Sequence, residues 1–156
     1  MEKEITEIIK INNGIIYKVI LIYSEKENID DLYQEVVLNL WKSYPKFRKE
    51  CSYSTWIYRV SLNTCISYFR KSRNRPLHIP ITTGLDYLYE NEVRDYEIEE
   101  LHSLINKLNK WDRAIIFLYL EDKPYKEIAE IMGITPSNVS TKINRIKEKL
   151  IQMSNK

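Results

Sequence analysis

Residues 53–75 read YSTWIYRVSLNTCISYFRKSRNR and carry the strongest signal in this chain. Their apolar spacing predicts a helix, along which aromatic and basic residues are interleaved before a cluster of cations that contains no acid. Cations neutralise the phosphates of duplex DNA, whereas the bases of an opened strand also stack on aromatic rings. The stretch therefore predicts a surface that handles DNA as it melts, and a core helix with a solvated basic end is the alternative.

The composition predicts an all-helical protein. The chain has 156 residues, of which 44% are hydrophobic, enough for one modest core or two small ones. It has only 3 Gly and 5 Pro, and apolar residues recur at helical spacing along most of its length. Cys51 and Cys65 form no CxxC pair and the chain has two histidines, so we expect buried, reduced thiols and neither a metal site nor a cofactor.

The start of the chain does not look like a targeting segment. The first residues, MEKEITEIIK, contain acids and lack an apolar stretch followed by a cleavage site. The apolar run 19–23 is far shorter than the roughly 20 residues that cross a bilayer. We therefore expect a cytoplasmic protein that does not insert into a membrane.

Charge divides the chain into three segments. Residues 1–75 carry a net charge of +4, residues 76–100 carry −6, and residues 101–156 carry +4. The middle segment contains two prolines and a glycine near its start and shows no helical pattern until near its end. We predict two small helical domains, 1–75 and 101–156, joined by an acidic linker. The acids fit either a solvated hinge or a segment that occupies a nucleic-acid channel.

Residues 125–150 read YKEIAEIMGITPSNVSTKINRIKEKL and predict a helix, a tight turn and a second helix. Ala129 is small enough to let the second helix cross closely, and Gly133 can adopt the left-handed conformation that ends many helices. Thr135 is a natural N-cap, with Pro136 at the first helical position. The segment thus predicts a helix-turn-helix, although a plain helical hairpin is an alternative.

The second helix of this motif has one apolar stripe, formed by Val139, Ile143, Ile146 and Leu150. Its other faces carry polar side chains suited to base edges and phosphates, at a length that fits a major groove. The side chains predicted to contact duplex DNA are Ser137, Asn138, Thr141, Lys142 and Arg145.

Residues 30–44 predict a third kind of surface. The helical pattern places Leu32, Val36, Val37, Leu40, Trp41 and Tyr44 on a buried face. The opposite stripe consists of Asp31, Gln34, Glu35, Leu38 and Lys42. An exposed leucine is ordinary by itself, but here it lies among acids that repel DNA. The stripe therefore indicates a site for docking another protein.

These segments together resemble the sigma factors of bacterial RNA polymerase. The run 31–41, DLYQEVVLNLW, resembles the D-L-x-Q-E-x-F-L-x-x-W signature of region 2.2. Phe47-Arg48 and the run 52–63, SYSTWIYRVSLN, resemble the F-R and F-x-T-W-L-Y-R-I-A-x-N signatures of regions 2.3 and 2.4, and 108–150 resembles region 4. The likeness covers nearly the whole chain without regions 1.1 and 3, as in the extracytoplasmic-function subfamily (ECF, group 4).

The chain departs from the family pattern at three positions. Val37 stands where an aromatic residue is usual, Tyr53 where phenylalanine is common, and Asn109 where proline is general. Tyr53 keeps an aromatic face, and Asn109 can still cap the helix that starts near Trp111. The departures leave the expected fold unchanged.

The resemblance implies core RNA polymerase and promoter DNA as partners, and it allows an anti-sigma factor. Asp31, Gln34, Glu35 and Leu38 would dock on the clamp helices of the largest polymerase subunit. The loop 49–54 would form part of a pocket for a base flipped out of the −10 element, and the linker would thread toward the RNA exit channel. The residues expected to contact −10 or adjoining DNA are Lys49, Ser52, Tyr53, Ser54, Tyr58, Arg59, Asn63, Arg70, Lys71, Arg73 and Arg75. Trp56, Ile57 and Val60 are expected in the core, and the helix from Pro136 is expected in the −35 major groove.

The expected function is transcription initiation, with promoter recognition, help in melting the −10 region, and no catalytic residue. A stand-alone helix-turn-helix regulator is the alternative, but it leaves the acidic linker and the aromatic-basic segment without a role. A metal-dependent nuclease is a weaker alternative. Asp30, Asp31 and Glu35 cluster, yet the basic face lacks the carboxylates and histidines that would hold a metal.

Overall fold

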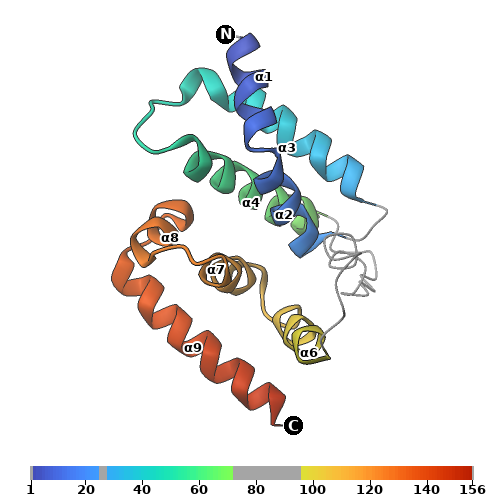
Figure 1. Cartoon of the computed structure of the whole chain (residues 1–156), viewed down its shortest axis with the longest axis vertical. Helices are drawn as coiled ribbons and strands as arrows, with labels where there is room; N and C mark the ends of the chain where they lie inside the picture. The colour runs from blue at the N-terminus through green and yellow to red at the C-terminus, as the bar shows by residue number, and fades with distance from the viewer. Residues whose placement is uncertain (1, 25–27, 72–95, 156) are drawn as a thin grey trace. The chain divides into compact units, whose positions relative to one another are not determined.

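The computed structural model of the chain describes residues 2–24, 28–71 and 96–155 (Figure 1). Every secondary-structure element in these ranges is a helix, so the predicted all-helical fold is confirmed. The chain divides into two compact units, Met1–Pro80 and Ile81–Lys156. Most of the predicted linker 76–100 lies outside the described residues, and helix α6 begins at Tyr96, before the predicted start of the second domain. The domain boundaries therefore stay a prediction.

Unit 1 is built around helix α4. Its elements are α1 (Glu2–Ile11), α2 (Asn13–Tyr23), α3 (Ile29–Ser43), the short 3-10 helix η1 (Tyr44–Lys46) and α4 (Tyr53–Lys71). Helix α4 packs against both α2 and α3, which also contact each other (Figure 1). The loop 47–52 leads from η1 back to the start of α4.

The core of unit 1 is mainly apolar and includes one hydrogen bond between the side chains of two helices. Leu32, Val36 and Leu40 of α3 are fully buried, as their spacing predicts. The rings of Tyr23 in α2 and Phe69 in α4 lie 6.5 Å apart. Helix α3 is also tied to α4 by a hydrogen bond from Asn39 Nδ2 to Thr64 Oγ1 of 2.9 Å. These contacts set the rotation of α4 about its own axis.

Unit 2 contains α6 (Tyr96–Ile105), α7 (Lys110–Leu120), α8 (Tyr125–Met132) and α9 (Pro136–Ser154). Helix α9 contacts each of the other three. Asn109 caps α7 as expected, because its side chain accepts a hydrogen bond of 2.8 Å from the backbone N–H of Asp112.

The predicted helix-turn-helix is confirmed in its local details. Gly133 has φ +71°, and the backbone N–H groups of Gly133 and Ile134 both donate to the carbonyl of Ala129, at 2.9 and 3.1 Å. Thr135 Oγ1 accepts from the backbone N–H of Asn138 at 3.1 Å, and Pro136 occupies the first turn of α9. A left-handed residue and an N-cap only two positions apart make the turn tight, which fixes the direction in which α9 leaves α8.

The two described glycines offer a matched test of this turn. A Cβ at Gly133 or at Gly14 of α2 would meet no atom within 4 Å, so substitution there changes backbone preference alone. Gly133→Ala should lower the free energy of unfolding by about 1–2 kcal/mol, because L-residues avoid positive φ. Gly14→Ala should raise it by about 0.5–1 kcal/mol, because alanine favours a helix. Urea unfolding followed by circular dichroism measures both, and effects of the same sign would contradict the assigned turn.

Candidate functional site

Helix α3 exposes two large apolar side chains, Leu38 and Trp41, among polar and acidic ones. Gln34, Leu38 and Trp41 follow one another at spacings of four and three residues, which places them on one face of the helix. Leu38 is 51% exposed and Trp41 is 38% exposed, while Asp31 and Glu35 lie exposed beside them. We call Asp31, Gln34, Glu35, Leu38 and Trp41 the α3 stripe.

The prediction that Trp41 belongs to the buried face of this helix is wrong. Trp41 lies seven residues from Gln34, or about two helical turns, so the two share a face. That spacing is visible in the sequence, but the large apolar side chain of tryptophan favoured the prediction that Trp41 is buried. Of the other predicted members, Leu32, Val36, Leu40 and Tyr44 are buried and Val37 is partly buried.

Helix α1 extends the α3 stripe. A hollow of about 470 Å³ lies beside Trp41 and is lined on the α1 side by Glu2, Lys3, Thr6 and Glu7. The surface thus has an apolar centre with carboxylates around it. Such a surface suits a partner protein with apolar and basic side chains, because carboxylates repel the phosphates of DNA.

The loop 47–52 starts on a cluster of four aromatic side chains. The ring of Phe47 stacks on Trp56 at a centroid distance of 4.8 Å and an angle of 25°, and it lies 5.5 Å from the ring of Tyr53. Tyr44 lies 5.9 Å from Trp56. Trp56 is consequently 6% exposed and Ile57 is fully buried, as predicted, whereas Val60 is only partly buried. We call Tyr44, Phe47, Tyr53 and Trp56 the aromatic cluster.

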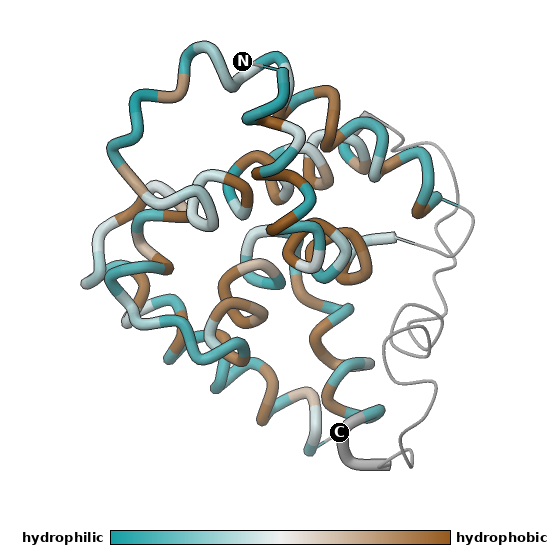
Figure 2. The backbone as a smooth tube through the Cα atoms, turned by 45° about the horizontal axis from the view of Figure 1, so that its top comes forward, coloured by the Kyte–Doolittle hydropathy of each residue, from teal (hydrophilic) through white to brown (hydrophobic). Residues whose placement is uncertain are grey.

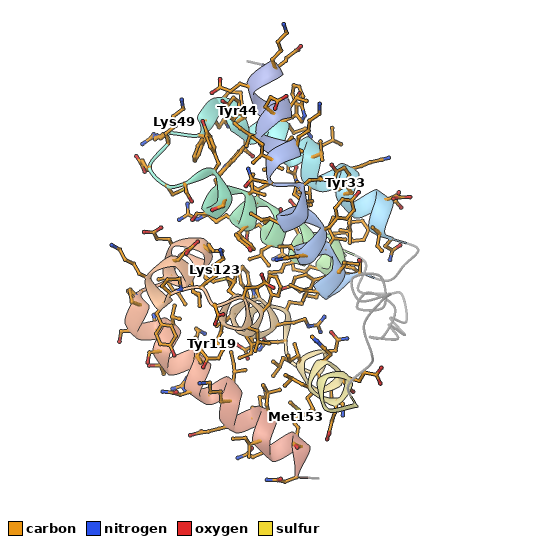
Figure 3. The ribbon with its side chains drawn as sticks, in the orientation of Figure 1. Tyr33, Tyr44, Lys49, Tyr119, Lys123 and Met153 are labelled. Atoms are coloured by element: carbon orange, nitrogen blue, oxygen red, sulfur yellow. The ribbon has the colours of Figure 1, made fainter. Side chains whose placement is uncertain are left out.

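The tip of this loop is polar and exposed. Arg48, Lys49 and Glu50 are exposed, and the tip is hydrophilic in Figure 2. Figure 3 shows Lys49 on the loop, with Tyr44 where the loop leaves α3. Ser52 caps α4 at the other end, because its Oγ accepts from the backbone N–H of Thr55 at 3.2 Å and lies 3.1 Å from Ser54 Oγ. The predicted loop residues Lys49, Ser52, Tyr53 and Ser54 are therefore close together.

The outer face of α4 continues from this loop. Arg59, Asn63 and Arg70 lie on one stripe at spacings of four and seven residues, with Asn63 and Arg70 exposed and Arg59 partly exposed. Helix α4 ends at Lys71, whose side chain is not described, and Arg73 and Arg75 lie outside the described residues. The structure therefore places three of the predicted polar side chains on one face of α4, the helix that begins where the loop 47–52 ends.

Tyr58 does not belong to this face, which corrects the prediction that it contacts DNA. It is 2% exposed and shares a stripe with Leu62, Cys65 and Phe69, all of them buried. Successive helical residues are about 100° apart, so a helix that turns Arg59 and Asn63 toward solvent turns Tyr58 away from that face. Cys65 is a free thiol on the same stripe, and burial raises its pKa to about 12.

Helix α9 separates apolar and polar side chains cleanly. Val139, Ile143 and Ile146 are buried, while Leu150 is partly exposed. Asn138, Lys142 and Arg145 form one polar stripe, and Ser137 and Thr141 form the adjacent one. All five are exposed except Lys142, which is partly buried, so the structure presents every predicted duplex-contacting residue on the solvent side of α9.

A polar contact holds α9 against α7. Lys147 Nζ donates a hydrogen bond of 2.8 Å to Tyr119 Oη and lies 4.4 Å from the centre of the Tyr119 ring. Figure 3 shows Tyr119 on the side of α7 that faces α9. The hydrogen bond with Tyr119 is the main reason that the pKa of Lys147 is raised. The sequence pattern did not single out this pair, because 28 residues separate its members.

Neither a metal centre nor a membrane span is found in the part of the chain that the structure describes. Its His, Cys, Asp and Glu side chains form no group of three or more that could hold a metal ion. None of the described helices combines the length and the apolar character needed to cross a bilayer.

Two family models match the chain in separate places. The model described as Sigma-70 region 2 matches residues 13–75, and the model described as Sigma-70, region 4 matches residues 98–150. The ECF RNA polymerase sigma-E factor of Haemophilus influenzae is 29% identical over 143 residues, which are 81% of this chain and 74% of that protein. RNA polymerase sigma factor SigV of Bacillus subtilis is 26% identical over 129 residues, covering 80% of this chain and 76% of that protein.

A solved structure has the same fold. The sigma factor RpoE of Bartonella quintana, crystallised in complex with the anti-sigma factor NepR, aligns over 99% of this chain and 98% of its own with a TM-score of 0.68. The two sequences are 15% identical, so the likeness concerns the fold.

The aromatic cluster predicts a change in stability at high pH. Burial, followed by a hydrogen bond from its hydroxyl to Glu4, raises the pKa of Tyr44 from 10.0 to about 12. A raised tyrosine pKa means that the fold favours the neutral phenol, so this stabilisation is complete below pH 10 and is lost as the pH rises toward 12. Tyr44→Phe should therefore flatten the fall in thermal midpoint over that range, as measured by circular dichroism. A fall as steep as that of the wild type would contradict the assignment.

Proposed function

The chain belongs to the sigma-70 family of RNA polymerase sigma factors, in its extracytoplasmic-function group, and we propose that it directs core polymerase to promoters through three separate surfaces. The α3 stripe docks on the polymerase, the loop 47–52 with the outer face of α4 takes the −10 element, and the solvent face of α9 reads the −35 element. Sigma factors are initiation factors without catalytic activity, and this role requires no catalytic residue in the chain.

One observation carries this proposal. Two compact units follow each other in the order of sigma regions 2 and 4, and each unit has an exposed polar surface of its own. A stand-alone helix-turn-helix regulator needs only the second unit. The α3 stripe and the loop 47–52 belong to the first, so a function that uses both units accounts for more of the chain.

The α3 stripe supports docking by its chemistry. Leu38 and Trp41 offer apolar area at the centre, and the acids around them favour a partner with basic side chains. Buried aromatic and aliphatic side chains at the centre of an interface contribute most of the affinity. Charges at the rim mainly speed the encounter and exclude wrong partners.

The loop 47–52 and α4 support capture of an opened −10 strand. Arg59 and Arg70 can contact phosphates, while Asn63 and the hydroxyl of Ser54 offer hydrogen bonds to an unpaired base. Flipping a base out of the stack costs a few kcal/mol, which contacts in the loop must offset. Melting would follow from the greater affinity of this surface for the opened strand than for the closed duplex.

Transcription with core polymerase tests the function as a whole. Adding the chain to core polymerase on a library of genomic fragments should start transcripts at a defined set of sites that share upstream sequences. Core polymerase alone should not start there. Binding of the chain to the same sites in the absence of polymerase, with no transcripts, would favour the stand-alone regulator instead.

Docking is tested by reversing the character of one exposed leucine. Leu38→Arg should weaken binding to core polymerase by about 2 kcal/mol or more, roughly thirtyfold, because it places a charge in an apolar contact. The change should leave the fold intact, since Leu38 is already 51% exposed. Leu120→Arg is the matched control, because Leu120 is 49% exposed but belongs to unit 2 and lies outside the α3 stripe. Equal effects of the two variants in a pull-down, with unchanged circular dichroism, would exclude this docking surface.

Reading of duplex DNA is tested on α9. Lys142→Ala or Asn138→Ala should weaken binding to the −35 element by about 1–3 kcal/mol and relax the base preference at one position, because a base-edge contact is lost. Arg145→Ala should weaken binding to all DNA sequences alike and reduce the salt dependence of that binding, as expected for a phosphate contact. Lys107→Ala controls for loss of charge, since Lys107 is exposed in the same unit but lies outside α9. If the α9 variants change −35 binding no more than this control does, α9 is not the reading helix.

A further inference from the structure

Phe47 is the link between the loop 47–52 and the body of unit 1. Its ring stacks on Trp56, which is almost fully buried, and lies at a tilt of 42° to the ring of Tyr53 in the first turn of α4. Phe47 follows η1 directly, so the same residue ends the connection from α3 and starts the loop tip. The position of its backbone therefore depends on a contact with the core.

The rest of the aromatic cluster makes this contact rigid. Tyr44 packs against Trp56, and Glu4 of α1 and Tyr53 of α4 lie near its hydroxyl. Tyr44 is 9% exposed, and a buried ring that is packed against another ring has few alternative rotamers. Three elements, α1, η1 and α4, thus meet under the loop.

The loop tip is fixed at its other end as well. Ser52 caps α4 through its side chain, and its carbonyl accepts from the backbone N–H of Trp56 at 3.1 Å. Between the two anchors, Lys49 adopts a left-handed conformation with φ +60°, which is uncommon for a residue other than glycine, asparagine or aspartate. A short tip anchored at both ends holds this conformation, because its closure leaves few others.

We propose that Phe47 is a positioning residue that holds the loop tip in its base-receiving conformation before DNA arrives. The inference rests on the proposed role of this loop in −10 recognition. Phe47 acts through Trp56 and Tyr53 and makes no contact with the base itself. Tyr53 packs against Phe47 from the first turn of α4, so its ring also supports the loop.

Preorganisation explains why such a cluster would matter for selectivity. A loop that is ordered only on binding loses conformational entropy at that step, and ordering even one residue costs about as much as a tenfold change in affinity. This entropic cost weakens only those DNA contacts that require an ordered loop tip. Phosphate contacts made by Arg59 and Arg70 from the body of α4 do not need it.

The first arm of the test measures the free chain. Phe47→Ala should speed amide hydrogen exchange at Thr55 and Trp56, which donate to Ser52, by about tenfold, while the amide of Leu62 deeper in α4 exchanges as in the wild type. Phe47→Tyr keeps the stacked ring and should restore slow exchange. Equal exchange in wild type and Phe47→Ala would overturn the positioning role, whatever the chain does with DNA.

The second arm measures selectivity in the complex with core polymerase. Single-stranded DNA of randomised sequence is captured by the wild type and by each variant, and the bound strands are sequenced. Phe47→Ala should lower the enrichment of the preferred strand over unselected strands by about tenfold, which is about 1.4 kcal/mol. Affinity for unselected strands should stay the same, and Phe47→Tyr should recover the enrichment. An unchanged enrichment, or an equal loss for all strands, would overturn the proposal.

Two substitutions at Lys49 separate loop geometry from charge. Lys49→Asn and Lys49→Val both remove the cation, but asparagine tolerates the left-handed conformation and a β-branched residue does not. Both variants lose whatever DNA contact the cation makes, so Lys49→Val should lower the enrichment further than Lys49→Asn does, by about the loss seen with Phe47→Ala. Equal losses would mean that charge decides, and the positioning role would fall. If the wild type enriches no sequence at all while it binds polymerase, the proposed −10 function fails first and the positioning role with it.

Discussion

The burial of one side of α4 against α2 and α3 is the constraint on which unit 1 depends. Leu62, Cys65 and Phe69 occupy that side, and the helical geometry then forces Asn63 and Arg70 to the opposite one. The orientation of the polar face therefore follows from core packing and requires no additional contact. A substitution that rotated α4 in its groove would move the whole candidate DNA surface.

Helix α9 follows the same rule in unit 2, with two additional restraints. Its apolar stripe is buried, while the turn at Gly133 sets the direction of the helix and the contact between Lys147 and Tyr119 ties it to α7. A reading helix must present several side chains at once, so its rotation and its direction both need to be set. Local turn chemistry sets the direction, and packing sets the rotation.

The tryptophans of unit 1 illustrate how the surroundings decide the role of a side chain. Trp56 is 6% exposed because the chain folds back and Phe47 stacks on its ring, whereas Trp41 is 38% exposed on α3, beside a hollow that α1 lines. Both residues belong to motifs that resemble those of the sigma family. Trp56 supports the loop 47–52, whereas Trp41, which was predicted to be in the core, adds apolar area to the proposed docking surface.

The sequence by itself determined the helices, their caps and the helix-turn-helix, because these depend on contacts within about five residues along the chain. Asn109, Gly133 and Thr135 all do locally what their residue types predict. Only the tertiary structure decided that Tyr58 is buried and that Trp41 is exposed. Helical periodicity indicates which residues share a face. How much of the helix surface is buried depends on packing against elements that are distant in the sequence.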